Sequence, residues 1–203
     1  MSRDLIVLSS CTNSKFALQG IIESHAKLGI RRVTVDYVVH PNKDPGCLSQ
    51  SVELLRAQHS RFSYALVVFD RDGCGQNANP DILEGSVKQS LESNGWSGRC
   101  EVVVIEPELD VWVWSDSPQV DANLGWFGRI PALRSWLADE GHWPQNVPKP
   151  PRPKEALEDA LRVSKKRRTS KIYNDLAKGV SFQRCTDPAF NKLCNTLRLW
   201  FAV

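Results

Sequence analysis

Hydrophobic residues gather into four short runs rich in β-branched side chains, each about as long as a buried strand. The runs occupy residues 5–8, 33–39, 65–69 and 102–105. The segments between them carry apolar residues at three- and four-residue steps, which predicts helices over 16–28, 48–62 and 81–95. Because parallel strands need crossover connections, this alternation predicts an α/β fold with a mostly parallel four-stranded sheet flanked by helices.

The pattern changes after residue 105, where tryptophans become frequent and period-two runs stop. It predicts short helices at 110–114 and 131–139, a stiff Pro-rich connector at 144–153, and helices at 154–163, 169–178 and 188–201. This second part has an apolar stripe of its own to bury. We therefore expect an α/β core at 1–116 and, packed on it, a Trp-rich and basic helical extension at 117–203.

The composition is that of a folded globular protein. The 203 residues are 41% hydrophobic and 24% charged, which excludes a wholly disordered chain. No apolar run approaches the ~18–20 residues of a membrane span, and the residues before Leu5 lack a signal peptide's apolar region. We expect a cytoplasmic protein that does not enter the membrane. The six cysteines lie far apart without a C-x-x-C pair, which predicts free thiols and no disulfides rather than a zinc site.

Charge is distributed unevenly along the chain. Residues 1–148 carry 13 Lys and Arg against 18 Asp and Glu, a formal charge of −5, whereas residues 149–203 carry 13 against 5, a charge of +8. The basic part could contact nucleic acid, an acidic protein surface or the acidic part of its own chain.

One basic run is the best candidate for contact with the phosphate backbone of DNA or RNA, and the alternative is a solvated linker between helices. Its candidate residues are Lys165, Lys166, Arg167, Arg168 and Lys171. The five tryptophans between residues 112 and 143 could stack on bases, but core and interface anchors are the favoured interpretation.

Two carboxylates, Asp70 and Asp72, directly follow the apolar run at 65–69. In a parallel α/β sheet, ligands bind beyond the carboxyl ends of the strands, so these side chains should lie at the edge that forms sites. Paired carboxylates there suit Mg²⁺ or Mn²⁺, which prefer oxygen ligands. The alternative is that Asp-x-Asp-Gly is a strand-ending turn, where Asp and Gly are common for backbone reasons.

A second acidic cluster follows the run at 102–105 and contains Glu106, Glu108 and Asp110. If the last two strands are neighbours, both clusters converge on one edge of the sheet and can share a metal. The alternative is structural, because negative residues in a first helical turn favour the helix dipole.

The loop after the first strand is rich in hydroxyl groups and has no carboxylate. Ser10, Thr12, Ser14 and Lys15 could cradle a phosphate at a helix N-terminus, although the spacing is not that of a P-loop. The alternative is a helix-capping loop. Cys11 could be a nucleophile in the same loop, but no base is visible beside it.

These features resemble the Toprim fold, the metal-binding α/β domain of topoisomerases, primases and defence-associated nucleases. The order of elements and the Asp-x-Asp-Gly sequence at 70–73 carry the resemblance. Residues 107–116 (Pro-Glu-Leu-Asp-Val-Trp-Val-Trp-Ser-Asp) are similar to the Glu-Ala-Trp-Leu-Leu-Ala-Asp segment of small Toprim-like proteins, some of them encoded in phage-defence loci, including methylation-associated ones. Asp110 stands where their glutamate stands. Residues 152–158 and 185–193 also look similar to the C-terminal parts of those proteins.

The resemblance implies a Mg²⁺-dependent (or Mn²⁺-dependent) phosphodiester-processing, nuclease-type component of a prokaryotic antiphage defence system. Asp70, Asp72 and Asp110 would hold the metal, and Glu106 and Glu108 would serve as catalytic acid or base.

Toprim enzymes also place a glutamate just after the first strand, where this chain has only the hydroxyl-rich loop described above. The alternative is therefore a catalytically silent Toprim-like module that binds nucleic acid or a partner defence subunit.

Overall fold

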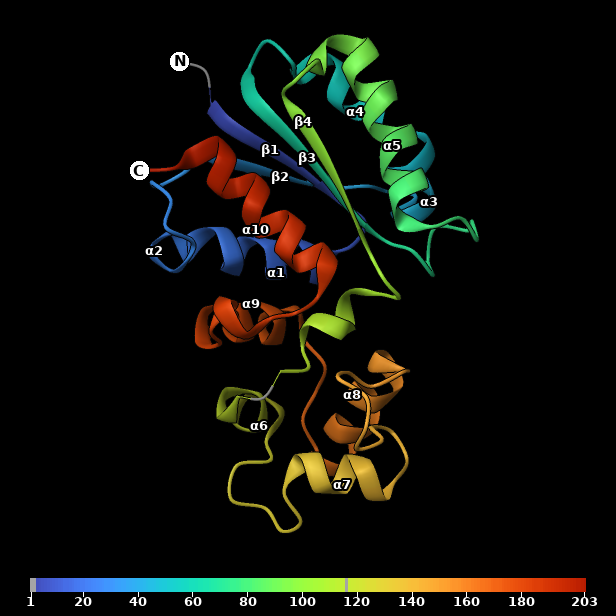
Figure 1. Ribbon diagram of the computed structural model, residues 1–203, viewed down its shortest axis with the longest axis vertical. Helices are drawn as coiled ribbons and strands as arrows, with labels where there is room; N and C mark the ends of the chain where they lie inside the picture. The colour runs from blue at the N-terminus through green and yellow to red at the C-terminus, as the bar shows by residue number, and fades with distance from the viewer. Residues whose placement is uncertain (1–2, 116) are drawn as a thin grey trace.

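A four-stranded, all-parallel sheet forms the centre of the protein in the computed structural model, which describes residues 3–115 and 117–203 (Figure 1). Its strands are β1 (Arg3–Ser9), β2 (Val35–Val39), β3 (Phe62–Asp70) and β4 (Cys100–Ile105), in the spatial order β2-β1-β3-β4. The predicted α/β class, with a parallel four-stranded sheet flanked by helices and followed by C-terminal helices, is confirmed.

Helices cover both faces of the sheet, which explains why β1, β3 and β4 contain continuous apolar runs. Side chains alternate along β1, so Leu5 and Val7 pack on one face while Ile6 and Leu8 pack on the other. The first face is covered by α1 (Thr12–Glu23), α2 (His25–Leu28) and α10 (Pro188–Phe201) (Figure 1). The second is covered by α3 (Lys43–Ser49), α4 (Ser51–Leu55), α5 (Pro80–Leu91) and the short turns η1 (Arg56–Gln58) and η2 (Glu92–Trp96).

The connections diverge between β1 and β3. The chain leaves β1 through α1 on one face to reach β2, and returns through α3 and α4 on the other face to reach β3. Such a reversal of strand order is the switch point at which open parallel sheets bind ligands, just beyond the carboxyl ends of the strands. The loops after β1 and β3 therefore occupy the position where a ligand site is expected.

The C-terminal half packs onto the α1 face of the sheet and extends beyond it (Figure 1). It contains η3 (Leu109–Trp112), α6 (Pro118–Leu124), α7 (Leu133–Asp139), α8 (Pro153–Ser164), α9 (Ser170–Gly179) and η4 (Phe182–Arg184). One buried apolar cluster runs from the sheet through α1 and α9 into the lobe formed by α6, α7 and α8. Helix α6 escaped prediction because it buries only Val120 and Leu124, too few positions to show a helical period.

Tryptophans hold this lobe together. The side chains of Trp114, Trp126 and Trp143 are buried. Their indole N–H groups donate to backbone carbonyl oxygens of Pro153, Ala160 and Val147, at 2.9, 3.0 and 2.9 Å. A buried indole needs such a partner, and the bonds of Trp114 and Trp126 each tie two distant segments, whereas that of Trp143 is local. The three side chains are thus structural anchors, as the favoured interpretation of the sequence had it.

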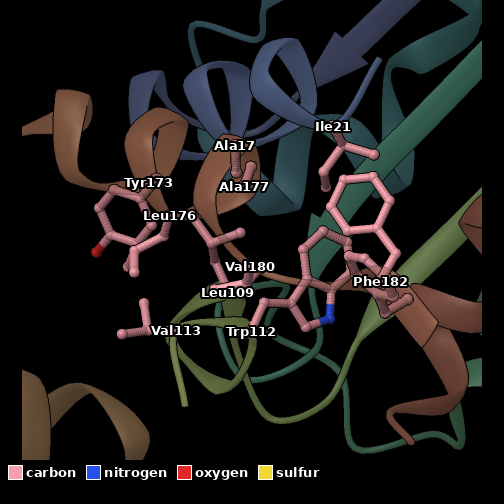
Figure 2. Close-up of a pocket in the computed structure, with 11 residues that line it drawn as sticks. Ala17, Ile21, Leu109, Trp112, Val113, Tyr173, Leu176, Ala177, Val180 and Phe182 are labelled. Carbon is pink, nitrogen blue, oxygen red and sulfur yellow. The ribbon is translucent and has the colours of Figure 1, made fainter. Parts of the chain in front are cut away.

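The joint between α1, η3 and α9 is apolar, with Ala17, Leu109 and Leu176 among the side chains that line it (Figure 2). The cavity there holds about 30 Å³, room for a water molecule and far less than an organic ligand requires. Figure 2 shows the Tyr173 hydroxyl pointing away from this joint. That hydroxyl donates a hydrogen bond to Asp110, described below. We interpret the joint as core packing rather than as a binding site.

The sequence predicts no membrane span and no disulfides. No helix in the described part of the chain is both long enough and apolar enough to span a membrane. All six cysteines are free thiols, and four of them (Cys47, Cys74, Cys100 and Cys194) are buried.

The contact between α1 and α9 predicts a stability change. A Cβ atom on Gly20 would lie 2.7 Å from the Asn174 carbonyl oxygen and 2.8 Å from the Ala177 Cβ. Gly20→Ala should therefore lower the free energy of unfolding by about 1–3 kcal/mol, measured by chemical denaturation. The matched control is Gly85→Ala in α5, where a Cβ meets nothing within 4 Å. That change should raise stability by about 0.5–1 kcal/mol, and two equal effects would contradict the packing argument.

Candidate functional site

The two acidic segments meet at the carboxyl edge of the sheet because β3 and β4 are neighbours. The last residue of β3, Asp70, pairs in register with Ile105, the last residue of β4. The backbone continues this pairing for two more residues, since the Arg71 N–H donates to the Ile105 carbonyl and the Asp72 N–H donates to the Pro107 carbonyl. The convergence expected from the sequence is therefore present.

Asp70 lies at the centre of this edge. Its carboxylate Oδ1 accepts a hydrogen bond from the Leu109 N–H at 3.0 Å. Burial raises its pKa well above the usual value, and the negative charges of Asp44, Asp110 and Glu108 raise the pKa further. These four carboxylates form what we call the acidic cluster. The high pKa of Asp70 means that its charged form is not stabilised in the way that a nearby cation would stabilise it.

Asp44 was not predicted from the sequence. It lies in the first turn of α3, and its Oδ1 accepts a hydrogen bond from the Asp70 N–H at 2.8 Å. Its other oxygen lies so close to the chain that a Cβ on Gly73 would come within 2.5 Å of it. Gly73 therefore makes room for the Asp44 carboxylate. The sequence does place an acidic residue shortly after β2. It was not recognised because the following helix was predicted to begin at residue 48, whereas α3 begins at Lys43.

Asp110 is 3% exposed and already bound to cationic and hydroxyl groups. The Tyr173 hydroxyl donates to its Oδ1 at 2.6 Å, and the Arg168 guanidinium donates to both its oxygens at 2.8 and 2.9 Å. Arg168 also donates to Glu158 at 2.8 Å. Asp110 thus serves to join the C-terminal helices to the sheet edge, and its oxygens are not free for a metal in this arrangement.

Glu108 is half-buried, and within the described residues it makes no ion pair. Burial raises its pKa, and the charge of Asp110 raises the pKa further, while Lys154 and Arg168 oppose the shift. A raised pKa brings a carboxyl group nearer to the pH at which it can both donate and accept a proton. Glu108 is accordingly the best-placed acid or base at this edge.

Asp72 and Glu106 lie on the solvent side of the edge, with side chains 57% and 55% exposed. Arg71 lies between them, with its guanidinium nitrogens 3.4 Å from Asp72 Oδ1 and 3.4 Å from Glu106 Oε1. Both carboxylates therefore face an arginine and not the acidic cluster.

The geometry sets a limit on metal binding. Across residues 3–115 and 117–203, no group of three His, Cys, Asp or Glu side chains converges as a ready-made metal site. Mg²⁺ does not require one, because it keeps several waters and often takes only one or two carboxylates plus substrate phosphates. Asp70 and Asp44 fit that lesser requirement, since both lie at the edge and neither is paired with Lys or Arg among the described ion pairs.

The loop after β1 caps α1. Cys11 is the N-cap, and its Sγ accepts a hydrogen bond from the Ser14 N–H at 3.4 Å. Ser14 is fully buried beside that sulfur, whereas Thr12 is exposed and Lys15 half-exposed. Ser10 is 1% exposed, and its hydroxyl has no hydrogen-bond partner within the described residues. The buried Ser10 hydroxyl, just before the 12-residue helix α1, thus makes no hydrogen bond to a described residue.

The basic run divides into anchored and free side chains. Arg168 is bound to Asp110, Lys166 donates to the Asn123 carbonyl, and Lys171 pairs with Asp175. Lys165 and Arg167 are exposed, and neither makes an ion pair with any described residue. Because Arg168 is bound to the acidic cluster, these two free cations lie in the segment anchored next to it.

Comparison of the chain with protein-family models, with curated proteins and with solved structures finds no match. Asp116, the last residue of the segment that carries the Toprim resemblance, lies outside the described residues.

The raised pKa of Asp70 predicts a pH dependence of stability. The folded state holds this proton at pH values where the unfolded chain, with the usual pKa near 3.8, has lost it. Wild-type stability should therefore fall as pH rises from about 3.8 through the raised pKa. Asp70→Asn removes that loss and keeps the oxygen that accepts from Leu109. Without divalent cations, the variant should be more stable than the wild type at pH 7, and its advantage should shrink toward pH 4.

The measurement is urea denaturation at several pH values. Asp72→Asn is the control, because this exposed side chain contacts Arg71 and not the acidic cluster. If Asp70→Asn and the wild type keep a constant difference in stability from pH 4 to pH 8, Asp70 is not an uncompensated buried acid.

Proposed function

We propose that this protein binds Mg²⁺ or Mn²⁺ at the carboxyl edge of its sheet and uses that site on phosphodiesters, as a nuclease-type enzyme. Asp70 and Asp44 would hold the cation, and water would complete its coordination and leave positions for phosphate oxygens. A cation held there would polarise the phosphate and activate water. The assignment to antiphage defence rests on the resemblance of residues 107–116 to small Toprim-like proteins.

One observation carries the proposal: Asp70 lies among three other carboxylates at the carboxyl edge of the sheet, and it makes no ion pair with any lysine or arginine that the structure describes. The Asp44 carboxylate accepts a hydrogen bond from the Asp70 N–H, and the charges of Glu108 and Asp110 raise the pKa of Asp70. Arg168 compensates Asp110 but makes no ion pair with the other three acids. Such an excess of negative charge costs stability unless the protein holds a proton or a cation there.

The start of α1 supports the phosphate part of the proposal. It lies after β1, next to β3 in the sheet, and its first turn contains no acidic residue. The N-terminal end of a helix favours anions, and the unpartnered hydroxyl of Ser10 adds a donor in the loop that leads into it. A phosphate there would lie between the helix and a cation at Asp70.

Glu108 would act as the proton donor or acceptor of the reaction. It takes the role that the resemblance assigns to Glu106 and Glu108 together, because Glu106 faces Arg71 and is 55% exposed. A half-buried carboxyl group with a raised pKa suits proton transfer near neutral pH better than an exposed one.

A second candidate is a silent module that binds nucleic acid or a partner defence subunit without cleaving it. Two observations favour it. The loop that follows β1 contains no carboxylate, and Asp110 is bound by Arg168 and Tyr173 rather than left open. Nucleic-acid binding by either candidate would use the cationic segment at 165–168, but only the enzyme needs Glu108.

The proposal predicts that single changes separate metal binding from catalysis. Asp70→Asn should abolish Mn²⁺ binding measured by calorimetry, because it removes the central ligand. Glu108→Gln should retain Mn²⁺ binding and lower the rate of Mg²⁺-dependent cleavage of plasmid or single-stranded DNA by about 10²-fold or more, the usual contribution of an acid or base.

Glu106→Gln and Asp72→Asn are the controls and should leave both properties near the wild-type values. Metal binding by the wild type with no turnover on any substrate, alone or with proteins encoded beside it, selects the silent module. Unchanged Mn²⁺ binding in Asp70→Asn would refute the metal site itself.

The basic segment predicts a change in the salt dependence of nucleic-acid binding. Replacing Lys165 and Arg167 by Gln should weaken binding to duplex DNA and reduce the slope of log K against log salt by about 1.8, about 0.9 for each phosphate that the protein no longer neutralises. Arg32 and Arg56, exposed near the amino-terminal ends of β2 and β3, supply the matched control pair. Equal slopes for both double variants would mean that the segment is a linker and does not bind nucleic acid.

A further inference from the structure

A second candidate site lies in the C-terminal lobe, away from the carboxyl edge of the sheet. It is a pocket of about 690 Å³ between α6, α7, the connector that precedes α8 and the segment after η4. Most organic ligands of proteins occupy pockets of about 300–1,000 Å³. Its polar and charged lining includes Ser115, Asp121, Arg134, Lys149 and Arg184. Nothing in the proposed cation site contributes to it.

Lys149 is the most informative side chain of this pocket. Its ammonium group donates to the Val111 carbonyl at 3.1 Å and to the Trp114 carbonyl. Among the described residues it makes no ion pair, and burial lowers its pKa. Asp187 lies close enough for its charge to raise that pKa. Its Oδ1 already accepts hydrogen bonds from the Trp112 indole N–H and the Phe190 N–H.

A half-buried ammonium normally has an anionic partner, because burial without one is costly. Two of the three N–H bonds of Lys149 are used by carbonyl groups, which are neutral. No described residue accepts a hydrogen bond from the third. The pocket wall therefore presents a cation that makes no ion pair with a described carboxylate, and only the more distant charge of Asp187 acts on it.

Ser115 provides a second unused group. Its hydroxyl is buried and has no hydrogen-bond partner in the described part of the chain. A buried hydroxyl without a partner costs free energy, which a ligand atom that accepts or donates a hydrogen bond would recover. Ser115 and Lys149 line the same pocket, so one ligand can satisfy both.

The remaining lining is cationic and aromatic. Arg184 is exposed and makes no ion pair with the residues described. Arg134 lies over the Trp143 ring, 4.4 Å from its centroid, and is fixed by hydrogen bonds to the Trp143 and Pro144 carbonyls at 2.7 and 3.1 Å. Among the described residues that line the pocket, three are cationic and one, Asp121, is acidic, and they lie beside an apolar wall of Leu133, Leu137 and Trp143.

We propose that this pocket binds a small organic anion that carries a phosphate or carboxylate group on an apolar, ring-containing body. The anionic group would lie against Lys149 and Arg184 and accept from the Ser115 hydroxyl. The ring would pack beside Trp143 and Leu137. This ligand is independent of the cation proposed at Asp70, because the two sites share no side chain.

The test is calorimetric titration of the full chain without divalent cations. The probes are AMP and indole-3-acetate as ring-bearing anions, adenosine as the neutral match of AMP, and inorganic phosphate as the anion without a ring. At least one ring-bearing anion should bind with a Kd below about 1 mM and more tightly than adenosine or phosphate. The AMP and indole-3-acetate arms distinguish a phosphate ligand from a carboxylate ligand.

Variants then locate the bound anion. Lys149→Met, which keeps the aliphatic stem, should weaken binding about tenfold or more, as should Arg184→Gln, which changes only an exposed side chain. Ser115→Ala should weaken binding without lowering stability, because the hydroxyl has no partner to lose. Lys27→Met is the matched control, since its ammonium also donates to two carbonyls, those of Lys178 and Val180, outside the pocket.

Three results would overturn the proposal. The first is that neither ring-bearing anion binds, and the second is that adenosine or phosphate binds as tightly as the tighter-binding of the two ring-bearing anions. The third is that Lys149→Met and Arg184→Gln both retain wild-type affinity. The Arg184 variant keeps the test decisive if Lys149→Met fails to fold, because Arg184 makes no described contact that folding would need.

Discussion

The ion pair between Asp110 and Arg168 is the interaction on which the arrangement of the two halves depends. Asp110 follows the carboxyl end of β4, whereas Arg168 comes from the segment between α8 and α9, and Tyr173 of α9 completes the contact with a bond of 2.6 Å. Removing one partner of such a buried pair typically costs about 3–5 kcal/mol, since the other charge is left without compensation. The pair therefore fixes the basic C-terminal helices against the acidic edge of the sheet.

This pairing also determines which acids remain available. Arg168 binds Asp110, and Arg71 lies between Asp72 and Glu106 on the solvent side. Asp70, Asp44 and Glu108 make no ion pair with another described residue, and both Asp70 and Glu108 have raised pKa values because of burial and neighbouring negative charge. The pattern of compensated and uncompensated carboxylates is thus the basis for placing a cation at Asp70.

The fold could be predicted from the sequence to a large extent, because buried parallel strands are continuous apolar runs and their order alternates with helical periods. The approach of Asp70 to residue 106 was expected only on the condition that the last two strands are neighbours, and β3 and β4 do pair. The partners of individual acids did not, because they depend on contacts between distant segments. Asp44 reaches Asp70 across 26 residues, and Arg168 reaches Asp110 across 58. Local periodicity in the sequence does not indicate which residues so far apart along the chain come into contact.

The most direct test of the account is the anomalous difference density of a crystal soaked in Mn²⁺. If Asp70 holds a cation, a peak should appear within coordination distance of its carboxylate, with Asp44 as the second protein ligand and water or phosphate in the remaining positions. Absence of a peak, with Asp70 and Glu108 instead paired to lysine or arginine side chains, would contradict it.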